Sequence, residues 1–205
     1  MERKRIVEKK STRRKPSGAA VKKESVTKAI EKALFEEWAA TGYSAISIES
    51  VAKRAGVGKA AIYRRWPSKI EMVIEMVNKV GIDLIVVPDT GDLFQDIRQL
   101  LVQLRRLLRH PLISSILPDL HAEMGRNDEL AEGIRTTLQV QRRTSAEKVL
   151  QRAIQRNQIG ADIDVEMTLD MLGSMIYWRM IITKNRADKE YLDKLTTVIV
   201  RSLSS

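Results

Sequence analysis

A segment in the first third of the chain concentrates cationic, hydroxyl and aromatic side chains at helical spacing. Residues 47–69 read SIESVAKRAGVGKAAIYRRWPSK. The apolar spacing predicts two short helices, and Gly56 between them can supply the left-handed residue that ends the first helix and turns the chain. A basic second helix that carries a tyrosine is typical of a helix-turn-helix, whose second helix enters the DNA major groove.

The outward face of the second helix is expected to carry the base-reading side chains. Packing of this helix onto the first leaves four residues facing outward: Lys59, Ala60, Tyr63 and Arg64. Lysine and arginine can read the edge of guanine, and a small alanine can admit a thymine methyl group. We therefore expect Lys59, Ala60 and Arg64 to contact base edges. Ser47 is expected to cap the first helix.

The positive charge lies in the same third of the chain. The 205 residues carry a net charge of +10. Residues 1–24 hold ten Lys or Arg against three Glu, and residues 47–70 hold six against one, so the rest of the chain is close to neutral. Such local charge drives binding to DNA phosphates by releasing counterions. A charge run alone would fit a solvated surface equally well, and its coincidence with the helix-turn-helix pattern favours DNA.

The composition excludes several other kinds of chemistry. The chain has no cysteine and only two histidines, which rules out disulfides and thiolate metal sites and leaves no metal motif. No cofactor is expected, because glycine-rich phosphate loops and nucleophile elbows are also missing. No secretory signal or membrane-spanning run is evident, so we expect a cytoplasmic protein without a membrane partner.

Along the whole chain, apolar periodicity predicts an all-α protein of about nine helices. The expected organisation is a flexible basic arm (1–20), a three-helix DNA-binding head (21–68) and a larger helical body for regulation and dimerisation (69–205). Outside the helix-turn-helix, helices are predicted over 22–40, 69–86, 93–108, 112–124 with a kink or new start at Pro118, 127–157, 164–185 and 189–203.

Two runs of residues resemble a known family. AKRAGVGK (52–59) and IYRRWPSK (62–69) resemble the DNA-binding signature of the TetR family of bacterial transcriptional regulators, over about residues 22–75. The resemblance implies a three-helix head, a linking fourth helix, a ligand-binding body, and homodimers whose last two helices form a four-helix bundle. Arg65 and Trp66 stand where the family commonly has His and Phe, and we expect Trp66 to be a buried plug.

The same resemblance implies which side chains hold phosphates. It assigns Tyr63 and Lys69 to this role, since a tyrosine hydroxyl donates from a rigid ring and a lysine at a helix N-terminus adds its charge to free N–H groups. Arg65, Ser47 and Lys28 are further candidates for DNA contacts.

The helix predicted over 164–185 is apolar on more than one face, which indicates burial on two sides. One side could pack into the body and the other against a partner subunit, although a monomer core would show the same pattern. The residues assigned to a homodimer interface are Met167, Gly173, Ser174, Leu192, Leu195 and Ile199.

A small-molecule effector is implied by the resemblance, and its identity is left open. Candidate pocket residues are Phe94, His121, Met124, Met171, Met175, Tyr177 and Trp178, each of which would also fit an ordinary core. Arg105, Arg106 and Arg109 beside His110 could attract an anionic ligand or form a solvated face.

These observations favour a ligand-responsive, sequence-specific transcriptional regulator, more specifically a repressor that binds double-stranded DNA at a palindromic operator as a dimer. One alternative is an architectural protein that binds DNA non-specifically and has no effector. A more remote alternative is an enzyme with a DNA-binding head.

Overall fold

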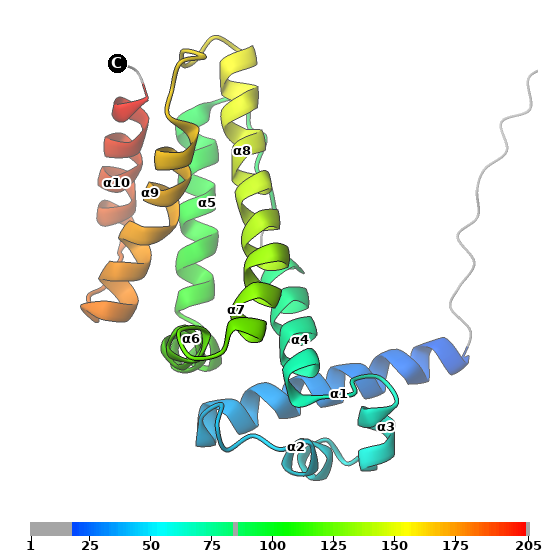
Figure 1. Cartoon of the computed structure of the whole chain (residues 1–205). Helices are drawn as coiled ribbons and strands as arrows, with labels where there is room; N and C mark the ends of the chain where they lie inside the picture. The colour runs from blue at the N-terminus through cyan, green and yellow to red at the C-terminus, as the bar shows by residue number, and fades with distance from the viewer. Residues whose placement is uncertain (1–17, 84–85, 204–205) are drawn as a thin grey trace, which may run out of the picture.

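The computed structural model describes residues 18–83 and 86–203, and within these ranges the chain is all-helical with no strand (Figure 1). None of the helices there is long and apolar enough to cross a membrane. In chain order the elements are α1 (Gly18–Thr41), α2 (Ile48–Ala55), α3 (Lys59–Tyr63), α4 (Lys69–Asp83), α5 (Leu93–Leu108), α6 (Pro111–Met124), α7 (Asp128–Ile134), η1 (Arg135–Gln139), α8 (Val140–Gln155), α9 (Val165–Tyr177), η2 (Trp178–Ile182) and α10 (Lys189–Ser202).

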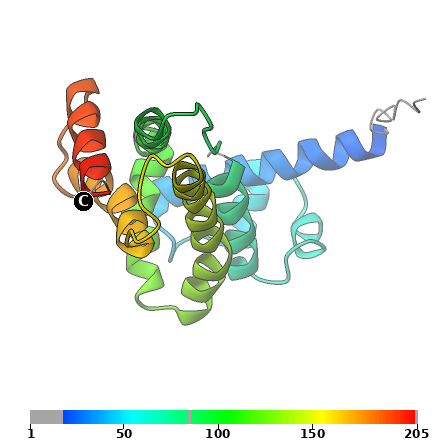
Figure 2. The ribbon, with the colours of Figure 1, turned by 90° about the horizontal axis from the view of Figure 1, so that it is seen from above.

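The helices form a small head below a taller body (Figure 1). Helix α1 crosses beneath the body, with α2 and α3 on its far side, and α4 rises from the head alongside α7 and η1. Helices α5, α8, α9 and α10 stand upright together, and α6 crosses the lower end of α5. Seen from above, α1 projects beyond the body on one side (Figure 2). The head is therefore joined to the body by α4 and by the packing of α1 against α6.

Two hydrophobic cores divide the structure, and their border does not follow the predicted domain boundary at residue 68. The first core combines α1–α3 with α4, α6, α7 and η1, and it includes the fully buried Trp38, Met72 and Ile134. The second core lies among α5, α8, α9, η2 and α10, around Ile97 and Ile176. The head thus shares one continuous core with α4, α6, α7 and η1 of the body.

The observed helices follow the predicted ones with four differences. Helix α1 begins at Gly18, inside the range assigned to the arm, and residues 1–17 of that arm lie outside the described part of the chain. Helix α4 is described only to Asp83, and Val86 is not helical. Helix α6 continues through Pro118 without a new start.

The fourth difference is that two long predicted helices contain π-helical segments. The helix predicted over 127–157 is α7, η1 and α8 in succession, and the helix predicted over 164–185 is α9 followed by η2. Counting each continuous succession as one helix gives nine helices in the described ranges, as predicted. A π turn inserts an extra residue into the helix, and such segments are frequent at functional sites.

Candidate nucleic-acid interface

The first helix of the motif is fixed at both ends by local interactions. The Ser47 hydroxyl accepts from the backbone N–H of Ser50 at 3.0 Å, and the Ser50 hydroxyl accepts from the N–H of Ser47 at 3.2 Å. This reciprocal arrangement is a capping box. At the other end Gly56 has φ 67°, the left-handed conformation predicted for it. The capped helix and its sharp turn fix where α3 begins.

The inner side of α3 is anchored in the first core. Ile62 is fully buried, and Trp66 just beyond the helix is 2% exposed. The Trp66 indole Nε1 donates to the Glu75 carboxylate at 2.8 Å. Because Glu75 belongs to α4, this bond ties the end of the recognition segment to the linking helix. The prediction that Trp66 is a buried plug is confirmed.

The outer side of α3, together with its C-cap residue Arg64, carries the four residues predicted to face outward. Lys59, Ala60, Tyr63 and Arg64 are all exposed, and Tyr63, although aromatic, is 53% exposed. An exposed tyrosine beside two cations gives this face a ring, a hydroxyl and positive charge together. Its use in DNA binding stays a prediction, but its exposure is as expected.

Lys59 is held in place by an acidic neighbour on α2. Its Nζ lies 2.7 Å from the Glu49 carboxylate, and the hydrogen bond from Lys59 lowers the pKa of Glu49. Both side chains are mostly exposed. A pair of this kind contributes little to stability in water. It can therefore exchange for a contact with DNA at small cost.

Lys69 occupies the first residue of α4, as the phosphate assignment requires, and it also has partners within the head. Its Nζ donates to the Tyr43 carbonyl at 3.1 Å and lies 4.4 Å from the centre of the Tyr43 ring. The side chain is half-buried. These contacts hold the Lys69 ammonium group against Tyr43, which lies in the connection between α1 and α2.

The remaining candidate DNA contacts are directed elsewhere. Arg65 is half-buried and donates to the Thr27 hydroxyl of α1 at 2.8 Å, so its guanidinium faces α1. Ser47 uses its hydroxyl for the capping box. Lys28 is exposed on α1 and pairs with Glu24 at 2.8 Å, which raises the pKa of Lys28. Of these three, Lys28 alone is an exposed cation, and its ion pair with Glu24 is open to solvent.

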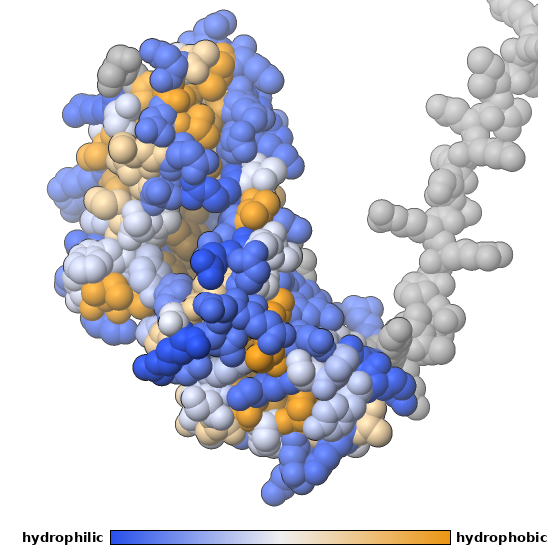
Figure 3. Space-filling model, in the orientation of Figure 1, coloured by the Kyte–Doolittle hydropathy of each residue, from blue (hydrophilic) through white to orange (hydrophobic). Residues whose placement is uncertain are grey.

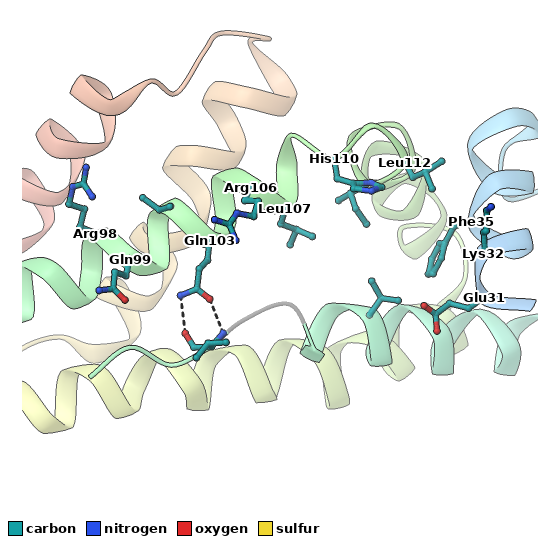
Figure 4. Close-up of a pocket in the computed structure, with 14 residues that line it drawn as sticks. Glu31, Lys32, Phe35, Arg98, Gln99, Gln103, Arg106, Leu107, His110 and Leu112 are labelled. Carbon is teal, nitrogen blue, oxygen red and sulfur yellow. Dashed lines mark hydrogen bonds between the residues drawn. The ribbon is translucent and has the colours of Figure 1, made fainter. Parts of the chain in front are cut away.

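The body contains two adjoining hollows. The outer one is a groove of about 730 Å³ between α1, the end of α4, α5 and α6 (Figure 4). Arg106 and His110 of α5 and its C-terminal turn line this groove, and Gln103 is bonded to the backbone of Val86 there. The inner one is a cavity of about 380 Å³ among α4–α6, η1, α8 and α9. The two share the wall residues Phe35, Val80, Leu107 and Ile113.

The predicted pocket residues are only partly where they were expected. His121 and Tyr177 line the inner cavity, and His121 Nδ1 lies 2.7 Å from the Tyr177 hydroxyl. Burial lowers the pKa of His121 and raises that of Tyr177. The other five candidates line neither of the two hollows: Phe94, Met124, Met171, Met175 and Trp178. Helical periodicity identified apolar faces but did not show which face meets a hollow.

Sequence reasoning missed Arg142, which lines the inner cavity. A signal was available. Arg142 follows the buried Leu138 by four residues and precedes the buried Val149 by seven, so helical spacing places it on the apolar stripe. An arginine at such a position is either paired inside the core or functional.

The predicted dimer interface needs a similar correction. Leu192, Leu195 and Ile199 are 0%, 5% and 0% exposed within a single protomer, because they belong to the second core, and so they face the protomer's own interior. Gly173 and Ser174 line the inner cavity. Met167 is 61% exposed, as an interface residue should be.

The exposed apolar residues of the body form a different set. On α9, η2 and α10 they are Met167, Met175, Trp178, Ile182 and Val198. In the face that Figure 3 shows, hydrophobic residues gather over the upper body, between the positions of α10 and α8 in Figure 1. Large exposed apolar patches mark interaction surfaces.

A capped helix, a glycine turn and an exposed basic helix, set below a helical body, define a helix-turn-helix DNA-binding regulator. Comparison with protein families agrees. Residues 30–76 match the model for bacterial regulatory proteins of the tetR family, and residues 87–199 match the tetracyclin repressor-like C-terminal domain. The chain therefore belongs to the TetR family, whose members are transcriptional regulators and not enzymes.

Individual proteins that are similar to this chain align with most of its length. An uncharacterized HTH-type transcriptional regulator of Bacillus subtilis, YdeS, is 29% identical over 172 residues, which cover 84% of this chain and 86% of YdeS. The DNA-binding transcriptional repressor TetR of Mycobacteroides abscessus is 30% identical over 142 residues, covering 69% and 74%. The crystal structure of the TetR family regulator SCO0332 superposes with a TM-score of 0.69 at 26% identity, covering 88% of this chain and all of that one.

Proposed function

We propose that this protein is a ligand-responsive repressor that acts in the cytoplasm and binds a palindromic operator as a homodimer. The observation that carries the proposal is the outer face of α3, where Lys59, Tyr63 and Arg64 are exposed on a helix whose other side is buried. A recognition helix needs this combination, because the buried side fixes its angle while the exposed side enters the groove.

Each candidate residue has a distinct task in the proposed complex. Lys59 and Arg64 contact base edges, and Ala60 leaves room for a thymine methyl group. Tyr63 and Lys69 bind phosphates and set the register of the helix on the duplex. Arg65 plays a supporting part, because its bond to Thr27 fixes the recognition segment against α1.

Dimerisation is proposed to use the exposed apolar residues of α9, η2 and α10. Met167, Met175, Trp178 and Ile182 recur at helical spacing, so they line one side of a single continuous helix. Val198 presents a further apolar side chain on α10. A two-fold dimer through this surface would place two heads on the two halves of a palindrome.

Helix α4 is proposed to transmit the effector signal. Its first residue, Lys69, is bonded to the head, and its upper half packs closely against α7 and η1. A Cβ built at Gly81 would lie 2.5 Å from Leu138, and one at Gly133 would lie 2.5 Å from Ile74, so backbone and side chain approach closely at both places. A ligand that displaces these contacts would shift α4 and change the spacing of the heads. Such a ligand represses DNA binding only if it binds the non-DNA state more tightly.

A footprint of the purified protein on the DNA flanking its own gene tests the proposal. We expect protection of two half-sites about one helical turn apart, in successive major grooves. Competition with random DNA then measures specificity, and a preference for the footprint sequence of roughly 10³-fold or more is expected. A protein that random DNA displaces equally well would be a non-specific binder instead.

The ligand-responsive part needs its own measurement. A screen by thermal shift and operator binding should find compounds that stabilise the protein and weaken its DNA complex. Compounds that change neither quantity across the whole screen would contradict an effector-controlled mechanism, while leaving the footprint result intact.

A further inference from the structure

The inner cavity is lined by apolar and neutral side chains except for one arginine. Its walls come from leucines, isoleucines, valines and Phe35, with the neutral polar groups of Gln139, His121, Ser174 and Tyr177. Arg142 is the charged residue among them, and none of the described residues lining the cavity is Asp or Glu. The cavity therefore holds a positive charge in surroundings that offer no negative one.

Arg142 has no partner in the described structure. Its Nε is shielded from solvent and makes no hydrogen bond, and none of the ion pairs of the described residues includes it. Burial lowers the pKa of the Arg142 guanidinium. The next residue shows the ordinary alternative: Arg143 pairs with both Glu166 and Asp170. Arg142 is half-buried, and a charge that is shielded from water and has no partner is costly, so we expect Arg142 to lower the stability of the ligand-free protein.

Arg142 lies close to α4, the helix proposed to transmit the effector signal. It lines the inner cavity and also a smaller hollow of about 160 Å³ beside α9. Its Nη2 would lie 3.3 Å from a Cβ at Gly81 of α4. The π segment η1 ends three residues before it and supplies Leu138 and Gln139 to the cavity wall. A ligand that pairs with this guanidinium would thus bear directly on α4.

We propose that the inner cavity binds an organic carboxylate with an apolar body, whose carboxylate group pairs with Arg142. A planar guanidinium can bind a carboxylate through two parallel hydrogen bonds, and Arg142, which lines the cavity without an ion-pair partner among the described residues, is free to make them. The leucine-rich walls take the apolar part of the ligand, and the His121–Tyr177 pair offers a neutral hydrogen-bonding group. This assignment rests on the proposed effector-controlled function and names the chemical class of the effector.

The outer groove offers a positively charged route by which an anionic ligand could reach the inner cavity. It shares four wall residues with the inner cavity, and Arg106 and His110 line it. Arg106 is exposed and takes part in none of the ion pairs of the described residues. The one acidic residue among the described residues lining the groove, Glu31, is paired with Lys79, so the unpaired Arg106 favours the approach of an anion over that of a cation.

Thermal-shift and calorimetric titrations of the full-length protein test the proposal. The probes are benzoate, 4-phenylbutyrate and decanoate, each compared with its primary amide at the same concentration. We expect at least one carboxylate to raise the melting temperature by several degrees, and its amide to bind about 10- to 100-fold more weakly. Equal binding of acid and amide, or no shift with any of the three acids, would overturn the proposal.

The variant Arg142→Met separates a ligand-binding arginine from a structural one. It removes the unpaired charge and keeps an apolar chain of similar length, so the ligand-free variant should melt at a higher temperature than the parent. The same variant should lose the carboxylate-specific shift, and Arg142→Lys should retain part of it. A lower melting temperature for ligand-free Arg142→Met, or an unchanged response to the acids, would show that Arg142 serves another purpose.

Arg143→Met is the matched control, because it removes a neighbouring arginine whose charge is already paired. It should lower the melting temperature slightly or leave it unchanged, with the carboxylate response intact. Operator binding measured with the same probes separates the two proposals. Carboxylate binding without any change in operator affinity would support the site and contradict the effector-controlled function.

Discussion

The carboxylate of Asp119 accepts a hydrogen bond of 2.6 Å from the indole Nε1 of Trp38. The same oxygen accepts from the backbone N–H of Tyr43 at 2.7 Å. Asp119 belongs to α6, whereas Trp38 and Tyr43 lie at the end of α1 and in the connection to α2. Asp119 thus fixes Tyr43, whose carbonyl accepts the hydrogen bond from Lys69. It also ties the head to the body independently of α4.

Replacing Asp119 with Ala should lower the free energy of unfolding by about 2–3 kcal/mol, because two donors in the first core lose a charged acceptor. Urea denaturation measures this change. Glu132→Ala, at an exposed acidic position of α7, is the control and should change stability by no more than about 0.5 kcal/mol. Equal effects of the two substitutions would mean that the Asp119 bonds contribute nothing.

Gly56→Ala should lower the free energy of unfolding by about 1 kcal/mol through backbone conformation alone. Gly56 has φ 67°, and a Cβ built there meets no atom within 4 Å, so the cost comes from the left-handed conformation and not from a clash. Gly58→Ala is the matched control, since Gly58 has φ −73° and is equally open. Similar losses for both variants would contradict this reason.

The features that the sequence predicted well are those set by neighbouring residues. The cap at Ser47, the turn at Gly56 and the outward face of α3 each depend on a few adjacent side chains, and each was found as expected. Trp66 was also placed correctly, because the aromatic sits where the chain must turn from α3 into α4.

The features that the sequence did not predict depend on which helix faces which. Both Leu192 and Met167 belong to apolar stripes, but only the three-dimensional packing buries Leu192 and leaves Met167 exposed. Arg142 and Arg143 are adjacent and chemically identical, yet one faces a cavity and the other a pair of carboxylates. Periodicity gives the faces of a helix and does not give their partners.

The two classes of DNA contact should respond differently to substitution. Tyr63→Phe removes one hydroxyl from an exposed ring. We therefore expect the binding free energy to weaken by about 1 kcal/mol for operator DNA and for random DNA alike. Arg64→Ala should instead change the preference at particular base pairs by about 1–3 kcal/mol. Binding to a library of operator variants measures both. A uniform loss for Arg64→Ala would move Arg64 to the phosphate-binding class.

Trp178→Asp should shift the proposed homodimer toward monomers, because Trp178 is 62% exposed in one protomer and lies in the proposed interface. Burying an unpaired carboxylate there would be unfavourable. Sedimentation velocity at several concentrations follows the change, and unfolding of the monomer should be little affected. The comparison is Lys148→Asp on the exposed side of α8, which should leave the association unchanged. Parent and Trp178→Asp proteins of equal mass in solution would exclude this surface as the interface.

The His121–Tyr177 pair should make stability depend on pH between about 7.5 and 5.5. Burial lowers the pKa of His121 below its ordinary value of 6.5, so in this range the unfolded chain binds more protons at this residue than the folded chain does. The free energy of unfolding should therefore fall as the pH falls, with a slope of at most about 1.4 kcal/mol per pH unit. Comparing His110→Asn with the double variant His110→Asn/His121→Gln isolates His121, since the chain has only two histidines. The loss should be smaller in the double variant, and identical slopes would show that His121 titrates alike in the folded and unfolded chains.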